Sequence, residues 1–349
     1  MTKLMTISLL GATALAVAGC GQNQGSDGAA RDAIRIVGSS TVYPMSTAVA
    51  EQFVRKNPQF KAPIVESTGT GGGMKLFCGG IGTQHPDIAD ASRRIKSSEV
   101  ELCVKNGVKE IIEIQIGIDG IALAESVAGQ PLALTPADVY KALAARPFGK
   151  PQTAQTWADV NPSLPAVKIN VYGPPPTSGT RDALAELILE AGCKTDPAMK
   201  ALKETNEDEY KAVCTGIRED GAYVDAGEND NLIVQKLAAN ADSVGIFGYS
   251  FLEENLGRVR GIALSGVTPT YDSIADFSYP GSRPLYIYVK GAHLTAVPGL
   301  REFIAEYAKA WNKDGYLVRR GLIAAPDDVR AKNAEVAANL TPLDLANVK

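Results

Sequence analysis

The stretch AIRIVGSSTVYPMSTAV, residues 33–49, decides the fold class, because a strand, a turn and the start of a helix follow one another in it. Residues 33–37 alternate as a short strand does, and Gly38 ends them. Pro44 suits the first turn of a helix, and apolar residues at helical spacing follow it. The same order recurs downstream: further strands are predicted at 62–66 and 168–172, and the glycine cluster is predicted to be a turn before a short helix at 74–78. The long apolar run at 111–124 predicts a buried strand or a hinge crossing, and Thr135 with Asp138 predicts a capping box at the start of a helix. This alternation predicts an α/β fold.

Three Ser/Thr/Gly clusters precede predicted helices, at residues 38–41, 67–73 and 177–180. Helix N-termini present unpaired backbone N–H groups and a partial positive charge, and hydroxyl groups add neutral donors. Taken alone, each cluster is more often a helix cap and turn than a ligand site. Three clusters at strand-to-helix junctions together favour a small oxyanion such as phosphate, because ligands of α/β sheets gather at the carboxyl ends of strands. The candidate ligand residues are Ser39, Ser40, Thr41, Thr70, Gly71, Ser178, Gly179 and Thr180.

Four further candidates lie beside these clusters. Ser92 and Arg93 follow a predicted strand end, and Arg181 follows the third cluster. Arginine forms forked hydrogen bonds to phosphate oxygens; a surface ion pair is the alternative, more so for Arg181, which stands beside Asp182. Asp90 is either a turn residue or the acceptor of the proton that phosphate keeps and sulfate lacks at neutral pH. A buried carboxylate there would repel a fully deprotonated oxyanion.

Several classes of function lack their signatures in this chain. The net charge is −4 and no basic run occurs, so nucleic acid and anionic lipid are poor partners. The glycines form neither the dinucleotide fingerprint nor a phosphate-binding P-loop, and no G-x-S-x-G elbow of a serine hydrolase occurs. The two histidines, His85 and His293, read as loop residues and no C-x-x-C occurs, so we expect no metal and no cofactor.

The N-terminal segment is typical of an export signal. A basic start and an apolar run lead to Val17-Ala18-Gly19-Cys20, which is similar to a bacterial lipoprotein processing site. That similarity implies a signal peptide over 1–19 and a lipid on Cys20; ordinary signal cleavage is the alternative. Residues 20–32 are rich in Gly, Asn, Gln and Ser, which predicts a flexible tether. We therefore expect an exported protein that is anchored at a membrane and soluble in body.

The four remaining cysteines suit an oxidising compartment. Sequence alone allows three pairings into two disulfides. We favour the local pairs Cys78–Cys103 and Cys193–Cys214, each of which closes a loop of intermediate length.

Taken in order, several segments resemble those of the periplasmic phosphate-binding proteins that serve phosphate ABC importers. The segments are GSSTVYP at 38–44, GTGGG at 69–73, DIADASR at 87–93, SGT at 178–180, DN at 230–231, GIFGY at 245–249 and SRPLY at 282–286. The resemblance implies a type II periplasmic-binding-protein fold, with one lobe from 33–117 plus 266–349 and the other from 118–265. It further implies phosphate held in the interlobe cleft by the residues named above, no catalysis, a membrane permease as partner and a monomeric protein.

One departure from that family pattern concerns selectivity. Many members carry an acidic residue shortly before Ser-Gly-Thr, and often an arginine upstream; here Pro174, Pro175, Pro176 and Thr177 stand in those places. Arg93 and Arg181 are then expected to supply the charge, and Asp90 the acceptor. Another tetrahedral oxyanion, sulfate or arsenate, stays open as the ligand. A secreted phosphatase and a lipid-anchored adhesive protein are the alternatives from other classes.

Overall fold

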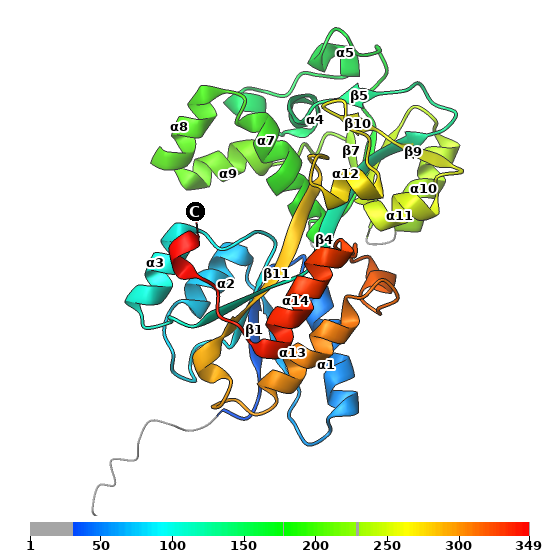
Figure 1. Cartoon of the computed structure of the whole chain (residues 1–349). Coiled ribbons are helices and arrows are strands. Elements are labelled where there is room, and N and C mark those ends of the chain that lie inside the picture. The colour runs from blue at the N-terminus through cyan, green and yellow to red at the C-terminus, as the bar shows by residue number, and fades with distance from the viewer. Residues whose placement is uncertain (1–30, 177, 228–229, 349) are drawn as a thin grey trace, which may run out of the picture.

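The computed structural model describes residues 31–176, 178–227 and 230–348. It has two lobes, one above the other in Figure 1, and we call them the first lobe (lower) and the second lobe (upper). The predicted signal peptide, residues 20–30 of the predicted tether and Thr177 lie outside the described residues. Within the described part of the chain, no helix is both long and apolar enough to cross a membrane.

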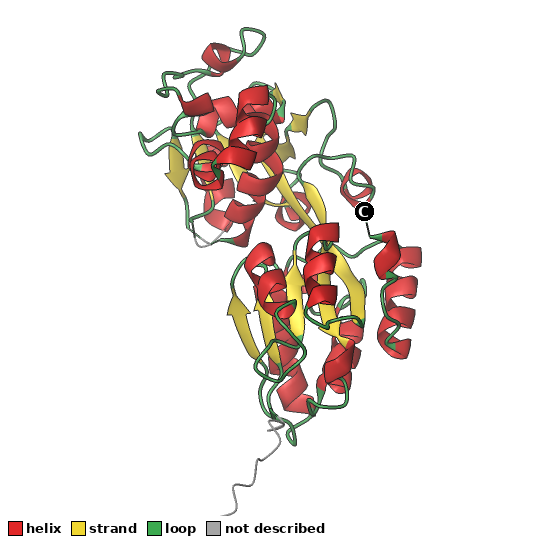
Figure 2. Cartoon of the chain, turned by 90° about the vertical axis from the view of Figure 1, so that its left-hand side faces the viewer, coloured by secondary structure: helices red, strands yellow, loops and turns green. Residues whose placement is uncertain are grey.

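The first lobe is built around parallel strands that begin at the stretch quoted above. Strand β1 pairs in parallel with β2 on one side and with β3 on the other, and helices follow each strand. The elements are β1 (Arg35–Gly38), α1 (Tyr43–Lys56), β2 (Ile64–Ser67), α2 (Thr70–Phe77), β3 (Ile88–Ala91) and α3 (Ser97–Lys105). Figure 2 shows helices on both sides of these strands. The predicted α/β class is confirmed.

Helix α2 differs from the prediction, which placed a turn over the glycine cluster and a helix only from Met74. The helix begins at Thr70 and includes Gly71, Gly72 and Gly73. A Cβ at Gly73 would lie 2.5 Å from the Cα of Gly38, so a side chain there would collide with the end of β1. The glycines are therefore part of a helix that packs directly on a backbone, a role that composition alone does not distinguish from a turn.

Two antiparallel strands connect the lobes. Strand β4 (Ile111–Ser126) and strand β11 (Ser282–Lys290) pair along most of their length, and both pass between the lobes in Figure 1. Near Ile111 strand β4 belongs to the first lobe, where β11 also pairs with β3, and from Ile121 onward it pairs with β8 and β9 of the second lobe. The long apolar run predicted as a buried strand or hinge crossing is β4.

The second lobe surrounds the far end of β4 with short strands and many helices. Its elements are β5 (Ala133–Leu134), α4 (Pro136–Leu143), η1 (Pro147–Gly149), α5 (Trp157–Val160), β6 (Val171–Gly173), α6 (Gly179–Ala183), the π-helix η2 (Leu184–Leu189), α7 (Glu190–Cys193), α8 (Pro197–Thr205), α9 (Glu207–Thr215), β7 (Tyr223–Asp225), α10 (Asp230–Ala239), β8 (Val244–Gly248), α11 (Tyr249–Glu254), β9 (Val259–Gly261), β10 (Ala263–Leu264) and α12 (Tyr271–Ala275). The capping box predicted at the start of α4, Thr135 with Asp138, is present.

The chain then returns to the first lobe through β11. The last elements are η3 (Gly291–His293), α13 (Leu300–Ala310), η4 (Val318–Arg320), α14 (Asp327–Asn339) and η5 (Leu345–Asn347). Helix α13 packs beside α1, and α14 lies against β4. The first lobe is thus completed only by residues from both ends of the chain.

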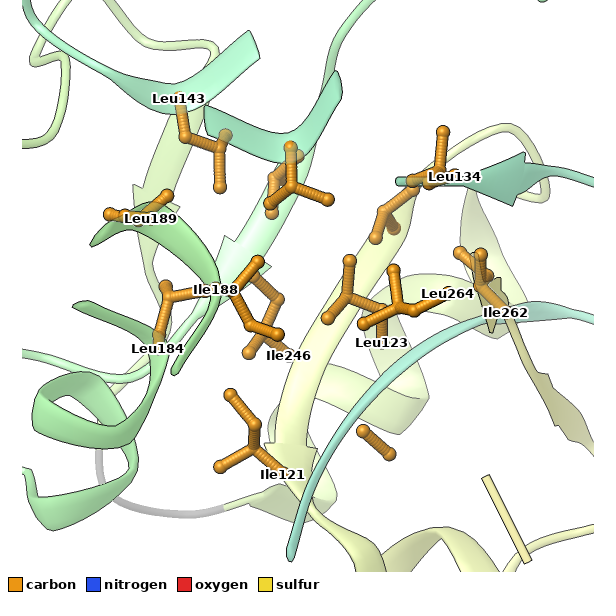
Figure 3. Close-up of a cluster of buried hydrophobic side chains, with 14 of the residues drawn as sticks. Ile121, Leu123, Leu134, Leu143, Leu184, Ile188, Leu189, Ile246, Ile262 and Leu264 are labelled. Carbon is orange, nitrogen blue, oxygen red and sulfur yellow. The ribbon is translucent and has the colours of Figure 1, made fainter. Parts of the chain in front are cut away.

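The two lobes have separate hydrophobic cores. The core of the second lobe includes Ile121 and Leu123 from β4, Ile246 from β8, and Leu184 and Ile188 from η2, which converge in Figure 3. It also takes in Ile274, Tyr279, Ile323 and Ala325. In the first lobe, one cluster fills the space between the sheet and α1 with α13, and a second lies under α2 and α3.

Both predicted disulfides are confirmed. Cys78 at the end of α2 is bonded to Cys103 in α3, and Cys193 at the end of α7 is bonded to Cys214 in α9. Each bond ties together two neighbouring helices of one lobe.

Candidate functional site

The first cluster is held against the end of the neighbouring strand. The loop after β1 is anchored by the Ser39 N–H, which donates to the Asp90 carbonyl oxygen at 2.9 Å. Gly38 has a φ of +141°, and a Cβ there would lie 2.1 Å from that same oxygen. Only glycine allows this approach, since any side chain would push the two strand ends apart. Ser39 and Asp90 are consequently adjacent and both buried.

The N-terminus of α2 lies beside the loop that follows β3. The Thr70 and Ser92 hydroxyl oxygens are 3.0 Å apart, and the Ser92 N–H donates to Thr70 Oγ1 at 3.1 Å. Both residues are buried. At the next position, Gly71, a Cβ would meet no atom within 4 Å, so there is open space at the start of this helix. The second cluster and the segment after β3 therefore form one polar corner of the first lobe.

The third cluster lies in the second lobe and contacts the loop after β1. The Thr41 hydroxyl donates to the Gly179 carbonyl oxygen at 3.4 Å, and the Ser40 hydroxyl donates to the Asp182 carboxylate. A Cβ at Gly179 would lie only 3.0 Å from the Thr41 Cα. Ser178 precedes α6, and its Oγ accepts the Thr180 N–H at 3.2 Å. The loop after β1 and the start of α6 thus touch across the two lobes.

A pocket of about 520 Å³ lies between the lobes beside this contact. Its walls include Thr41, Asp119 and the turn formed by Ser178, Gly179 and Thr180, and it continues toward α11 and η4. Ser39, Thr70, Asp90 and Ser92 do not line this pocket; all four are buried within the first lobe. The site therefore has a polar inner part in the first lobe and an open outer part between the lobes.

The two predicted arginines have other partners. Both Nη atoms of Arg93 donate to the Glu99 carboxylate, at 2.9 and 2.7 Å. Arg181 donates to the Pro174 carbonyl oxygen at 3.2 Å and stacks over the Tyr223 ring, 4.6 Å from its centroid. The structure therefore brings the hydroxyl clusters together, but among the described residues neither arginine side chain donates a hydrogen bond to them.

Asp90 lies under α1, in contact with the core of the first lobe. Its Oδ1 accepts a hydrogen bond from the Ser46 hydroxyl at 2.9 Å, and that hydroxyl is 2.7 Å from the Tyr307 hydroxyl. Burial raises the pKa of Asp90 to about 8, although the bond from Ser46 favours the charged form. The carboxyl is consequently protonated for the most part at neutral pH. The repulsion of a fully deprotonated anion, expected from the sequence, would develop only as the pH rises above about 8.

One functional candidate was missed by the sequence reasoning. Arg283 on β11 is buried and donates to Thr41 Oγ1 at 2.9 Å, to Asp119 Oδ2 at 3.0 Å, and to Glu186. The sequence did contain a signal for Arg283. Side chains of a strand alternate between its two faces, so Arg283 shares a face with Leu285 and the other apolar residues that follow. A charge in that phase marks a buried, partnered group.

The comparisons with known proteins agree with this architecture. A family model described as a PBP superfamily domain matches residues 23–310. Protein SphX of Synechocystis is 30% identical over 320 residues, which cover 90% of this chain and 83% of that protein. The phosphate-binding protein PstS of Staphylococcus saprophyticus is 30% identical over 307 residues, covering 86% of this chain and 84% of the relative. The chain belongs to the PBP superfamily, in the family of PstS and SphX.

The solved structures extend this result to the fold. A crystal structure described as a possible phosphate-binding protein from Planctomyces limnophilus is 28% identical, with a TM-score of 0.70, and covers 88% of this chain and 98% of that one. An ABC-type phosphate transport receptor from Vibrio cholerae, 22% identical with a TM-score of 0.55 over 83% of this chain and 99% of that one, shares the fold. The predicted family and the two-lobed fold are confirmed. This family consists of substrate-binding receptors of transport systems and not of enzymes.

Proposed function

We propose that this protein binds inorganic phosphate outside the cytoplasm and delivers it to the membrane permease of an ABC importer. The observation that carries the proposal is the meeting of hydroxyl and glycine segments from both lobes at one pocket, where Thr41 and Gly179 touch. Two facts support it: the family of the chain, and the presence of phosphate-binding proteins among its relatives.

The proposed ligands are neutral donors for the most part. We assign phosphate binding to Ser39, Ser40, Thr41, Thr70, Gly71, Asp90, Ser92, Arg93, Ser178, Gly179, Thr180 and Arg181. Hydrogen bonds to a charged group contribute about 1.5–3 kcal/mol net each, so about ten of them offset the desolvation of the anion and leave tight binding. Arg93 and Arg181 take part only if the anion replaces Glu99 or the Pro174 carbonyl oxygen as their partner.

The division of the phosphate donors between the two lobes couples phosphate binding to closure of the lobes. Ser39, Thr70 and Ser92 belong to the first lobe, whereas Ser178 and Gly179 belong to the second. Phosphate is then satisfied by all of its donors only when the lobes close on it, so binding shifts the population toward the closed form. Closure creates the surface that a permease recognises. No covalent step is part of this function, and we propose that the protein is not an enzyme.

The remaining proposals concern the cellular setting. We propose that residues 1–19 are removed on export, that Cys20 carries a lipid, and that residues 20–32 tether a monomeric body to the membrane. The sequence places the lobe boundaries at 33–117 plus 266–349 and at 118–265; because Ile274 of α12 and Tyr279 pack in the second lobe, we propose that the first lobe resumes only at β11 (Ser282–Lys290). Hinge crossings at β4 and β11 support that division.

Calorimetric titration of the mature chain tests the proposed ligand. We expect phosphate to bind with a 1:1 stoichiometry and an aryl phosphate to stay unhydrolysed. Sulfate should bind far more weakly than phosphate above about pH 8, where the ionised Asp90 repels a fully deprotonated anion. Arg93→Ala should weaken phosphate binding at least tenfold, because it removes a forked cationic donor. A protein that binds sulfate as well as phosphate, or that binds no anion, would contradict the proposal, and an unchanged affinity in Arg93→Ala would remove that residue from the site.

A further inference from the structure

Arg283 connects the hinge with both lobes. It stands on β11 between Tyr279, which belongs to the core of the second lobe, and Leu285, which belongs to that of the first. Its side chain is 5% exposed. Nε donates to Asp119 Oδ2 at 3.0 Å, Nη2 donates to Thr41 Oγ1 at 2.9 Å, and Nη1 forms an ion pair with Glu186.

The three partners belong to different bodies. Asp119 stands opposite Arg283 in the register of β4 and β11, so that ion pair is internal to the hinge. Thr41 belongs to the loop of the first lobe that contacts Gly179. Glu186 lies in the π-helix η2, whose Ile188 is buried in the core of the second lobe. In this structure, in which Thr41 touches Gly179 across the lobes, all three partners meet at the same guanidinium.

The solvent exposure of Asp119 and Glu186 indicates which of their ion pairs with Arg283 can open. A buried guanidinium needs a counter-charge, since an uncompensated buried charge is costly. Asp119, which is 17% exposed, supplies that charge from within the hinge. The Glu186 side chain is 53% exposed and hydrates readily when it separates. The pair between Glu186 and Arg283 can therefore open without leaving Arg283 unpaired.

The position of Glu186 couples this pair to the proposed ligand. The π-helix η2 continues directly from α6, whose N-terminus carries Ser178, Gly179 and Thr180. Because α6 and η2 are continuous, a rigid-body movement of the second lobe that separates Gly179 from Thr41 would also separate Glu186 from Arg283. The carboxylate of Glu186 also interacts electrostatically with Arg93 on the first-lobe side. One acidic side chain of the second lobe thus faces two arginines outside that lobe.

We propose that Glu186 and Arg283 form an interlobe latch that stabilises the closed arrangement and so sets the rate at which the bound anion is released. Both are positioning residues: Arg283 orients the Thr41 hydroxyl, and Glu186 holds the second lobe against the hinge. The inference rests on the proposed function for its ligand, phosphate. A half-exposed ion pair shifts an equilibrium about two- to fivefold, which suits a latch that must open in each transport cycle.

The test compares release rates in the mature chain and in its Glu186→Gln variant. Radiolabelled phosphate is bound and then chased with excess unlabelled phosphate. We expect Glu186→Gln to raise the release rate about two- to fivefold with little change in the association rate. In a background of Arg283→Lys, whose single ammonium cannot reach all three partners, the Glu186→Gln change should add nothing.

The matched control is Glu209→Gln. Glu209 pairs with Arg146 within the second lobe, and its side chain is 44% exposed, so the variant breaks a similar ion pair that does not cross between lobes. A release rate in Glu186→Gln equal to that of the control, or a slower one, would overturn the latch. Small-angle X-ray scattering without phosphate gives an independent reading, with a larger radius of gyration expected for Glu186→Gln. If no variant binds phosphate, the proposed function fails while the scattering comparison still decides the latch.

Discussion

Replacing Asp90 by asparagine tests whether the carboxyl beneath the loop after β1 is protonated at neutral pH. The asparagine amide has nearly the same shape, and its Oδ1 can still accept the hydrogen bond from Ser46 that Asp90 accepts at 2.9 Å. The variant therefore removes a titrating group and keeps the packing. Its effect on stability should depend on pH, because the folded and unfolded chains hold the Asp90 proton with different affinities.

The sign and the size of this pH dependence of stability follow from the pKa of Asp90. Burial raises the pKa of Asp90 from 3.8 to about 8 in the folded protein. Between these values the folded chain binds more protons than the unfolded chain, so stability is fully present below about pH 4 and is lost as the pH rises to about 8. At about 1.4 kcal/mol for each pH unit, the loss reaches ~6 kcal/mol as an upper limit. The Asp90→Asn variant has no carboxyl at this position, so its stability does not decrease in this way as the pH rises.

The assay is urea unfolding at intervals from pH 4.5 to 8.5, with the disulfides intact. We expect the free energy of unfolding of Asp90→Asn, relative to wild type, to increase steadily over this range. The control is Asp314→Asn, a change at an exposed residue that is expected to give a flat difference. A difference for Asp90→Asn that does not vary with pH would refute the reasoning, since it would mean that the Asp90 carboxyl is ionised throughout.

Three further changes probe the contacts around the site. Gly73→Ala should lower the free energy of unfolding by about 1–3 kcal/mol, because the new Cβ would lie 2.5 Å from a backbone atom of β1. In the control Gly72→Ala, the nearest atom to the new Cβ lies at 3.5 Å, so the loss of stability should be far smaller. Equal effects of the two variants in thermal unfolding would argue against this packing. Replacing Cys193 and Cys214 together by serine should destabilise the protein by about 2–4 kcal/mol with little effect on phosphate affinity, as measured by urea unfolding and calorimetry. Ser178→Ala should weaken phosphate binding at least tenfold in calorimetry, and an unchanged affinity would remove Ser178 from the site.

Local patterns in the sequence predicted those parts of the fold that local physics determines. Three such patterns specify a strand or a helix end without contacts to distant residues. They are the alternation at 33–37, the proline at position 44, and the capping box of Thr135 with Asp138. The two disulfides could also be predicted from the sequence, because each joins cysteines that are near in sequence. The first turn of α2, over residues 70–73, was not predicted as helix, because its glycines are explained by the backbone of β1, which only the folded sheet brings near.

The site was predictable as a set of segments but not as a set of contacts. Hydroxyl clusters at strand ends indicate where a ligand belongs, and Thr41 does meet Gly179 across the lobes. The partners of charged side chains depend on three-dimensional packing, which is why the pairing of Arg93 with Glu99 and the raised pKa of Asp90 were not foreseen. The same applies to Arg283, whose partners come from three separate regions of the chain.

The return of the chain through β11 has a consequence for biogenesis. The core that contains Ile36 and Ile114 also needs Phe303 and Tyr307 of α13, which are synthesised almost last. A chain that emerges from a ribosome or an export channel N-terminus first can assemble most of the second lobe early, apart from Ile323 and Ala325, but the first lobe stays incomplete until α13 arrives. Premature truncation near the C-terminus should therefore expose the apolar face of α1 and mark the fragment for proteolysis, even though most of the polypeptide is present.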